Sequence, residues 1–122
     1  MKKVLVVEDS ATTRAMIISI VETLPAVECT DAEDGLAALK ALPNDRFDAI
    51  LTDINMPGLT GLELISFVRS HPSYREIPII VISTEKAQTD KDRGFALGAS
   101  DYVTKPFAPM DLQRVVRQHL GI

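Results

Sequence analysis

Two patterns of apolar residues alternate along the chain. Short runs rich in apolar or β-branched residues are separated by longer stretches in which apolar side chains recur every three or four positions. Short runs bounded by turn residues favour buried strands, and the longer spacing favours amphipathic helices. The pattern predicts strands near residues 4–7, 27–29, 47–51, 77–82 and 101–104.

The stretches between and after these runs predict five helices. Side chains expected to face inward are Ile17, Ile20, Val21 and Leu24; Leu36, Leu39 and Leu42; Leu64, Ile65 and Val68; and Leu112, Val115, Val116 and Leu120. Pro25 ends the first helix, Thr60 and Glu63 have capping-box spacing, and Pro109 suits a first turn. Residues 85–97 give the weakest helix, because charge dominates it and Gly94 lowers its propensity.

Strands that alternate with helices predict an α/β fold. Parallel strands need crossover connections, which are right-handed almost without exception, so a three-layer (βα)5 sandwich follows. A chain of 122 residues with 46% hydrophobic residues fits one globular domain, which we expect to span residues 1–122.

Composition and charge argue against several classes of protein. The net charge of −4 argues weakly against nucleic acid as a direct partner. Cys29 is the single cysteine, so no intrachain disulfide can form, and no His/Cys spacing indicates zinc. Glu8 and Asp9 interrupt the first apolar run too early for a signal peptide or membrane span. We therefore expect a cytoplasmic protein without membrane insertion.

The residues that follow the predicted strands carry the candidate chemistry. Asp53 follows the third strand and precedes the stop signal Pro57-Gly58. On this stretch alone Asp53 could equally open a turn, as Asp often does. Glu8 and Asp9 follow the first strand, Ser83-Thr84 follows the fourth, and Lys105 follows the fifth. In open α/β sheets these carboxyl ends meet at one edge, where ligands bind.

The expected cluster of three carboxylates needs a cation or a proton, because like charges at short distance repel. Oxygen ligands suit Mg²⁺, and a hydroxyl with an ammonium across from it suits a phosphoryl group. An Asp carboxylate can act as a nucleophile toward phosphorus and form an acyl phosphate.

Four motifs resemble the response-regulator receiver family over essentially the whole chain, and most closely its stand-alone chemotaxis type. They are Val7-Glu8-Asp9-Ser10, Asp53 to Gly58, Val81 to Thr84, and Lys105-Pro106-Phe107, in that order. Each motif alone is weak, whereas the ordered set is specific. The resemblance implies a flavodoxin-like sheet of order 2-1-3-4-5, a strand order that is known for a chemotaxis regulator.

The resemblance also implies a role for each matching residue. Asp53 would accept a phosphoryl group from a histidine kinase. Mg²⁺ would be bound by Asp9, Asp53 and the backbone carbonyl of Asn55, with Glu8, where many members have Asp, acting mainly through water. Ser83 and Lys105 would contact the phosphoryl group, and the Lys105-Pro106 peptide would be cis. The aromatic switch residue would be Tyr102, and Asn55 and Glu85 would tune self-dephosphorylation.

Two other functions are considered. A Mg²⁺-dependent phosphohydrolase would need a second aspartate two residues after Asp53, where Asn55 stands, and a cap over its substrate. A flavodoxin-like cofactor module would need a hydroxyl- and glycine-rich loop after the first strand, where Glu8 and Asp9 would repel phosphate.

We therefore expect a phosphorylation switch rather than an enzyme acting on a separate substrate, used in chemotaxis or motility control. No linker or output domain follows Ile122. A complete chain would signal by docking on a target protein, whereas a fragment of a longer regulator would lack a DNA-binding or enzymatic partner domain. We expect a monomer. The expected docking face is made of the fourth helix, the fifth strand and the fifth helix.

Overall fold

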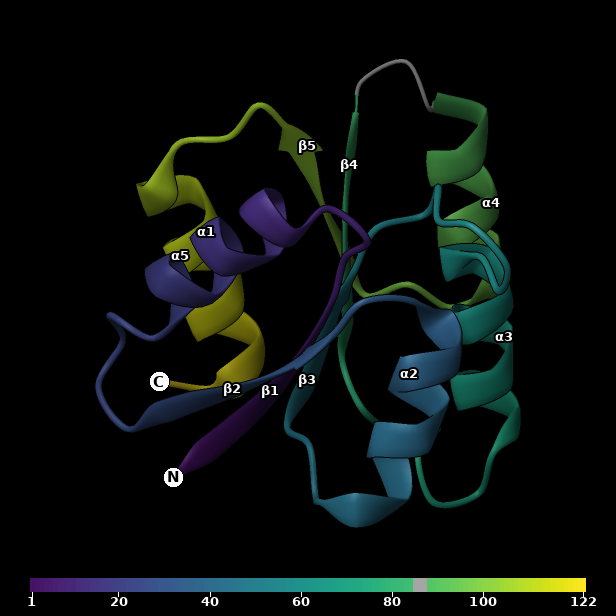
Figure 1. The fold of residues 1–122 in the computed structure, drawn as a ribbon, viewed down its shortest axis with the longest axis horizontal. Coiled ribbons are helices and arrows are strands. Elements are labelled where there is room, and N and C mark those ends of the chain that lie inside the picture. Colours follow the sequence, from purple (N-terminus) through teal and green to yellow (C-terminus); the bar gives the residue numbers. More distant parts are fainter. Residues whose placement is uncertain (85–87) are drawn as a thin grey trace.

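The computed structural model describes residues 1–84 and 88–122. Within them, a parallel five-stranded sheet has the order β2-β1-β3-β4-β5 (Figure 1). Its strands are β1 (Lys2–Val7), β2 (Val27–Ala32), β3 (Ala49–Thr52), β4 (Ile79–Thr84) and β5 (Asp101–Lys105). The predicted fold class and the strand order implied by the resemblance are confirmed.

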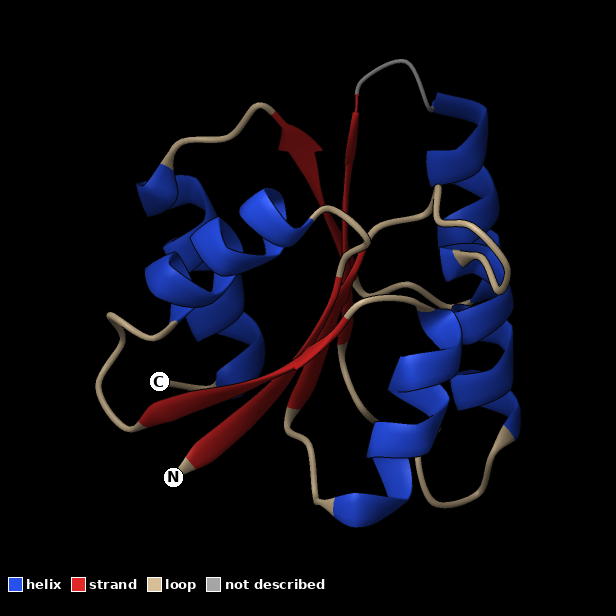
Figure 2. Ribbon diagram, in the orientation of Figure 1, coloured by secondary structure: helices blue, strands red, loops and turns tan. Residues whose placement is uncertain are grey.

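Helices cover both faces of the sheet (Figure 2). They are α1 (Ala11–Val21), α2 (Gly35–Ala41) with the short 3-10 turn η1 (Leu42–Asn44), α3 (Gly61–Ser70), α4 (Gln88–Leu97) and α5 (Pro109–Leu120). Helices α1 and α5 lie on one face, and α2, α3 and α4 lie on the other (Figure 1). No helix among the described residues combines the length and the apolar character needed to cross a bilayer.

Side chains alternate between the two faces of the sheet along each strand, so the hydrophobic core has two parts. Val4 and Val6 of β1 pack toward α1 and α5, whereas Leu5 and Val7 pack toward α2 and α3. All four are at most 1% exposed. A strand buried on both faces is expected where helices cover both sides of a parallel sheet.

Side-chain caps start α1 and α3, and the cap of α3 is the predicted one. The Ser10 hydroxyl accepts a hydrogen bond from the Thr13 N–H and caps α1. At α3 the capping box is complete, because the Thr60 hydroxyl accepts from the Glu63 N–H and the Glu63 carboxylate accepts from the Thr60 N–H. Such caps satisfy donors that a helix end leaves without intrahelical partners.

Two predictions about the elements were wrong. Leu36, predicted to face inward, is 56% exposed; Leu42 is buried as predicted, and Ala38 faces the core in place of Leu36. The reason is that α2 begins only at Gly35, so the pair spaced four apart, 38 and 42, faces the sheet. Strand β2 is also longer than predicted, because Val27 through Ala32 pair in register with Lys2 through Val7.

Candidate functional site

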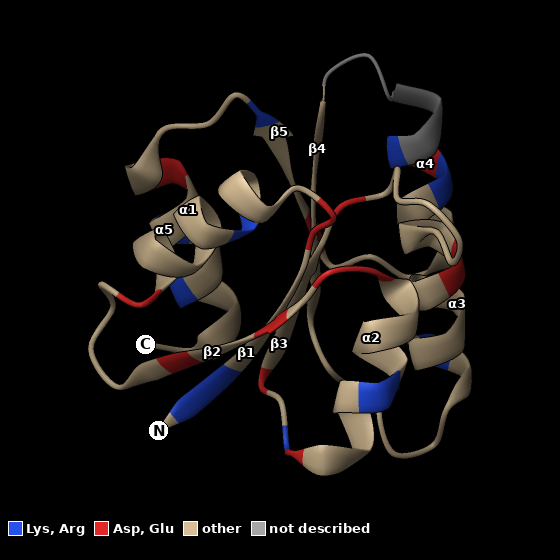
Figure 3. Cartoon of the chain, in the orientation of Figure 1, with Lys and Arg blue, Asp and Glu red and all other residues tan. Residues whose placement is uncertain are grey.

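Neighbouring strands bring Glu8 and Asp53 side by side. Val7 ends β1 and is the register partner of Thr52, which ends β3. The Asp53 N–H donates to the Val7 carbonyl at 3.2 Å, so the two chain segments stay paired one residue beyond the strands. Acidic residues accordingly gather at this edge of the sheet (Figure 3).

Glu8, Asp9 and Asp53 form an acidic cluster. Each offers a carboxylate oxygen, and these oxygens lie within 4.8 Å of one another. Glu8 is buried, Asp53 is half-buried and Asp9 is exposed. The predicted convergence of these three carboxylates is confirmed.

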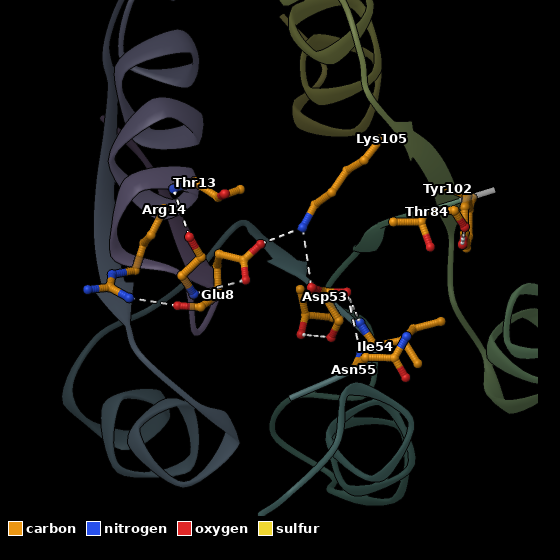
Figure 4. A network of polar contacts seen from close by, with 11 residues as sticks. Glu8, Thr13, Arg14, Asp53, Ile54, Asn55, Thr84, Tyr102 and Lys105 are labelled. Atoms are coloured by element: carbon orange, nitrogen blue, oxygen red, sulfur yellow. Dashed lines mark hydrogen bonds and ion pairs between the residues drawn. The ribbon is translucent and has the colours of Figure 1, made fainter. Parts of the chain in front are cut away.

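Lys105 reaches this cluster from the end of β5. Its Nζ donates to Glu8 Oε1 at 2.6 Å and to Asp53 Oδ2 at 3.2 Å (Figure 4). Its peptide bond to Pro106 is cis, as the resemblance implies. One ammonium therefore bridges carboxylates that leave two different strands.

Burial and charge act against each other in this bridge. Burial raises the pKa of the Glu8 carboxyl above its ordinary value, and Asp9 adds to this, although the Lys105 ammonium works in the opposite direction. Burial also disfavours the charged form of Lys105, yet Glu8 and Asp53 outweigh it and raise the pKa of the ammonium. The lysine therefore stays charged at neutral pH.

The Asp53 carboxylate is held at both oxygens. Oδ1 accepts from the backbone N–H of Ile54 at 2.7 Å and, more weakly, from that of Asn55 at 3.4 Å. Oδ2 faces Lys105, and the side chain is 13% exposed. The orientation of this carboxylate is thus set by the turn that follows β3, while solvent still reaches it.

Gly61, the first residue of α3, packs against the same turn. Its N–H donates to the Ile54 carbonyl at 2.9 Å. A Cβ at this position would lie 2.1 Å from the Asp53 carbonyl oxygen, so no other residue fits without moving the backbone. Sequence reasoning missed this role; a glycine at the first residue of a capped helix, where it lowers helix propensity, was the available signal.

Ser83 and Tyr102 lie on the two strands at the far side of the cluster. Ser83 is 2% exposed and pairs in register with Thr104, beside Lys105. The Tyr102 hydroxyl donates to the Thr84 carbonyl at 3.3 Å, and Lys91 Nζ lies 5.1 Å from the centre of its ring. Glu85, the other predicted tuning residue, lies outside the described residues.

The residues present fit a divalent cation. Three carboxylates converge, and each offers an oxygen atom as a metal ligand. One of them, Asp9, is exposed to water. Such a set of ligands suits a hard divalent cation that keeps part of its hydration shell. A half-buried carboxylate beside a lysine and a cation site is equipped to take up a group that carries negative charge, such as phosphoryl.

Comparison with known proteins agrees with this geometry. Residues 4–117 match the response regulator receiver domain family. The chain is 37% identical to chemotaxis protein CheY1 of Helicobacter pylori over 98% of this chain and 97% of the relative.

Two solved structures show the same fold. Chemotaxis protein CheY4 of Vibrio cholerae has a TM-score of 0.89 and 36% identity over 97% of this chain and 98% of that one. The receiver domain of sensor histidine kinase PA1611 of Pseudomonas aeruginosa, with a magnesium ion coordinated in its active-site cleft, has a TM-score of 0.89 and 30% identity over 99% and 98%.

Proposed function

The chain belongs to the response regulator receiver domain family, and on this premise we propose that Asp53 accepts a phosphoryl group from a histidine kinase. The observation that carries the proposal is the contact of 3.2 Å between Lys105 Nζ and Asp53 Oδ2 inside the acidic cluster. Glu8 shares both contacts, but its side chain is 2% exposed, whereas that of Asp53 is 13% exposed, which favours Asp53 as the carboxylate that a donor reaches.

In the transfer, a carboxylate oxygen of Asp53 forms a bond to phosphorus as the bond from phosphorus to the donor's histidine nitrogen breaks. The product is an acyl phosphate on Asp53. Lys105 pairs with the phosphoryl oxygens, and the Ser83 hydroxyl donates to one of them. These groups stabilise negative charge where it arrives.

Mg²⁺ fits the acidic cluster described above. Asp9, Asp53 and the Asn55 backbone carbonyl would hold it, and Glu8 would contribute through water. When bound, the ion supplies positive charge that lowers the repulsion between the carboxylates and an incoming phosphoryl group. The three carboxylates of the acidic cluster favour such an ion through their negative charge and hard oxygen donors.

Phosphorylation then acts as a switch. Ser83 and Lys105 move toward the phosphoryl group that they bind. Tyr102 turns inward from its present position, in which its hydroxyl donates to the Thr84 carbonyl. This changes the face formed by α4, β5 and α5, on which a target protein docks. A charge placed at one end of a two-state element is sufficient for such a change.

The relatives named as chemotaxis proteins support an output in chemotaxis or motility control. Return to the resting state is by hydrolysis on the protein itself, at a rate that Asn55 and Glu85 tune. This is the sense in which the protein is a switch and not an enzyme with a separate substrate. The cytoplasmic location, the monomeric state and the 1–122 domain span stay predictions.

Treatment with acetyl phosphate tests the proposal. Intact-mass analysis should show one labile phosphoryl adduct that requires Mg²⁺ and is absent from Asp53→Asn, because an amide does not attack phosphorus. Asp111→Asn, which changes an exposed acid of α5, is the matched control and should be modified like the wild type. An equal adduct on Asp53→Asn would show that Asp53 is not the acceptor.

A further inference from the structure

We propose that Arg14 is a positioning residue for the cation site, because it fixes the peptide between Glu8 and Asp9. The inference rests on the proposed function, since it concerns the ion held by the same acidic cluster. Arg14 itself does not touch the cluster's carboxylates; it acts on the backbone that carries two of them.

Arg14 makes two polar contacts that link α1 to the ends of β1 and β2. One guanidinium nitrogen donates to the Glu8 carbonyl at 2.7 Å (Figure 4). Its Nε lies 3.4 Å from Asp31 Oδ2. The Arg14 side chain is 16% exposed and Asp31 is 64% exposed, so the Glu8 contact is the better shielded of the two.

The Glu8 carbonyl needs a donor because the sheet ends there. The Glu8 N–H still donates to the Ala32 carbonyl at 3.1 Å, but β2 stops at Ala32 and the chain turns away into α2. The next strand residue, which would donate to the Glu8 carbonyl in a longer ladder, is therefore missing. Arg14 supplies that bond from the first turns of α1, whose start Ser10 caps.

Fixing this carbonyl fixes the plane of the peptide that joins Glu8 to Asp9, since the peptide bond is planar. Glu8 points inward to Lys105, whereas Asp9 is exposed. The directions of the two carboxylates thus depend on one peptide plane. Groups that orient metal ligands in this way typically change metal affinity by about tenfold or more when removed.

The charge of Arg14 and its positioning role predict opposite changes in Mg²⁺ affinity when Arg14 is replaced. A positive guanidinium near the site repels a cation, so removing it should tighten Mg²⁺ binding if charge dominates. If Arg14 positions the ligands, its removal should weaken binding instead. The sign of the change therefore separates the two roles.

The test is Mg²⁺ titration of the full chain by calorimetry at constant ionic strength. We expect Arg14→Met, which keeps the aliphatic stem, to bind Mg²⁺ about tenfold more weakly than the wild type. Asp31→Asn removes the exposed ion pair but leaves the Glu8 bond, and should stay within about twofold. Phosphorylation by acetyl phosphate should need more Mg²⁺ in Arg14→Met but reach the wild-type rate at saturation.

Equal or tighter binding by Arg14→Met would overturn the inference, as would a phosphorylation defect that persists at saturating Mg²⁺. If Arg14→Met does not fold, Arg14→Lys decides. A lysine keeps the positive charge but replaces the planar guanidinium group by a single ammonium, so we expect Mg²⁺ binding about threefold weaker than in the wild type. Wild-type affinity of Arg14→Lys would overturn the inference. A wild type that binds no Mg²⁺ would instead overturn the proposed metal site, and this inference with it.

Discussion

The Lys105 ammonium and the Glu8 carboxylate lie 2.6 Å apart, although 97 positions separate the two residues in sequence. The Glu8 side chain is 2% exposed and that of Lys105 is 22% exposed. The contact joins the ends of β1 and β5, which are not neighbours in the sheet. It therefore contributes to the fold as well as to the charge of the site.

Replacing Lys105 by Met should destabilise the protein, because Glu8 is then buried without its cation. We expect the free energy of unfolding to fall by about 2 kcal/mol at neutral pH, measured in urea with a chelator present. The double variant Lys105→Met with Glu8→Gln should recover most of this loss. A single variant as stable as the wild type would show that the pair contributes nothing to the fold.

Much of the site was predictable because a parallel sheet places every strand's carboxyl end at one edge. Glu8, Asp9, Asp53 and Lys105 could be brought together from strand ends alone. The strand order could not, because apolar periodicity does not record which strands pair; it came from the family resemblance. The inward position of Leu36 was wrong because a stripe of leucines does not fix where a short helix begins.

Contacts that depend on how neighbouring elements pack could not be predicted. The hydrogen bond from Arg14 to the Glu8 carbonyl depends on where β2 ends. The close approach of Gly61 to Asp53 depends on how the start of α3 packs against the end of β3. Both are tertiary distances. Neither leaves a periodic signal in the sequence.

Gly61→Ala should disturb both stability and phosphorylation. A Cβ there would lie 2.1 Å from the Asp53 carbonyl oxygen, so the backbone that carries Asp53 must shift. We expect a loss of about 1–3 kcal/mol in urea unfolding and slower adduct formation. Gly94→Ala in α4 is the control: its new Cβ meets nothing closer than 3.9 Å, and it should be neutral or stabilising by up to about 1 kcal/mol.

The rotation of Tyr102 can be followed by fluorescence, since the chain has two tyrosines and no tryptophan. In a Tyr74→Phe background, a beryllium fluoride adduct on Asp53 should change the emission of Tyr102. The physical reason is that the side chain leaves the Thr84 carbonyl and the Lys91 ammonium. Adding Ser83→Ala to this background should reduce the change in emission. If the adduct leaves the emission of the Tyr74→Phe protein unaltered, the proposed rotation of Tyr102 is excluded.

Asn55 should set the lifetime of the phosphorylated state. It is exposed, and its N–H faces the Asp53 carboxylate, so a larger side chain here would obstruct water in line with the acyl phosphate. We expect Asn55→Arg to lose phosphate about tenfold more slowly, a change of about 1.4 kcal/mol in the barrier. Phosphate release measures it, and an identical rate in both proteins would place the water path elsewhere.

Cys29 should be unreactive while the protein is folded. Burial, with Glu22 and Glu28 nearby, raises the pKa of its thiol from 9.0 to about 12. The folded protein then keeps a proton that the unfolded chain releases, so this thiol lowers stability as the pH rises from 9 toward 12. At pH 8.5, alkylation by iodoacetamide should be on the order of 100-fold slower than in urea. Rates within tenfold of each other would contradict the shift.

Both chain ends lie at the edge of the sheet opposite the acidic cluster. Strand β1 starts at Lys2, and Figure 1 shows both chain ends on the same side of the molecule. Met1 and Ile122 line the same surface pocket. A fluorescent protein or affinity tag attached at either end would therefore project away from Asp53 and Lys105. Labelled versions of this protein can report on localisation or partner exchange in living cells without obstructing the phosphoryl donor.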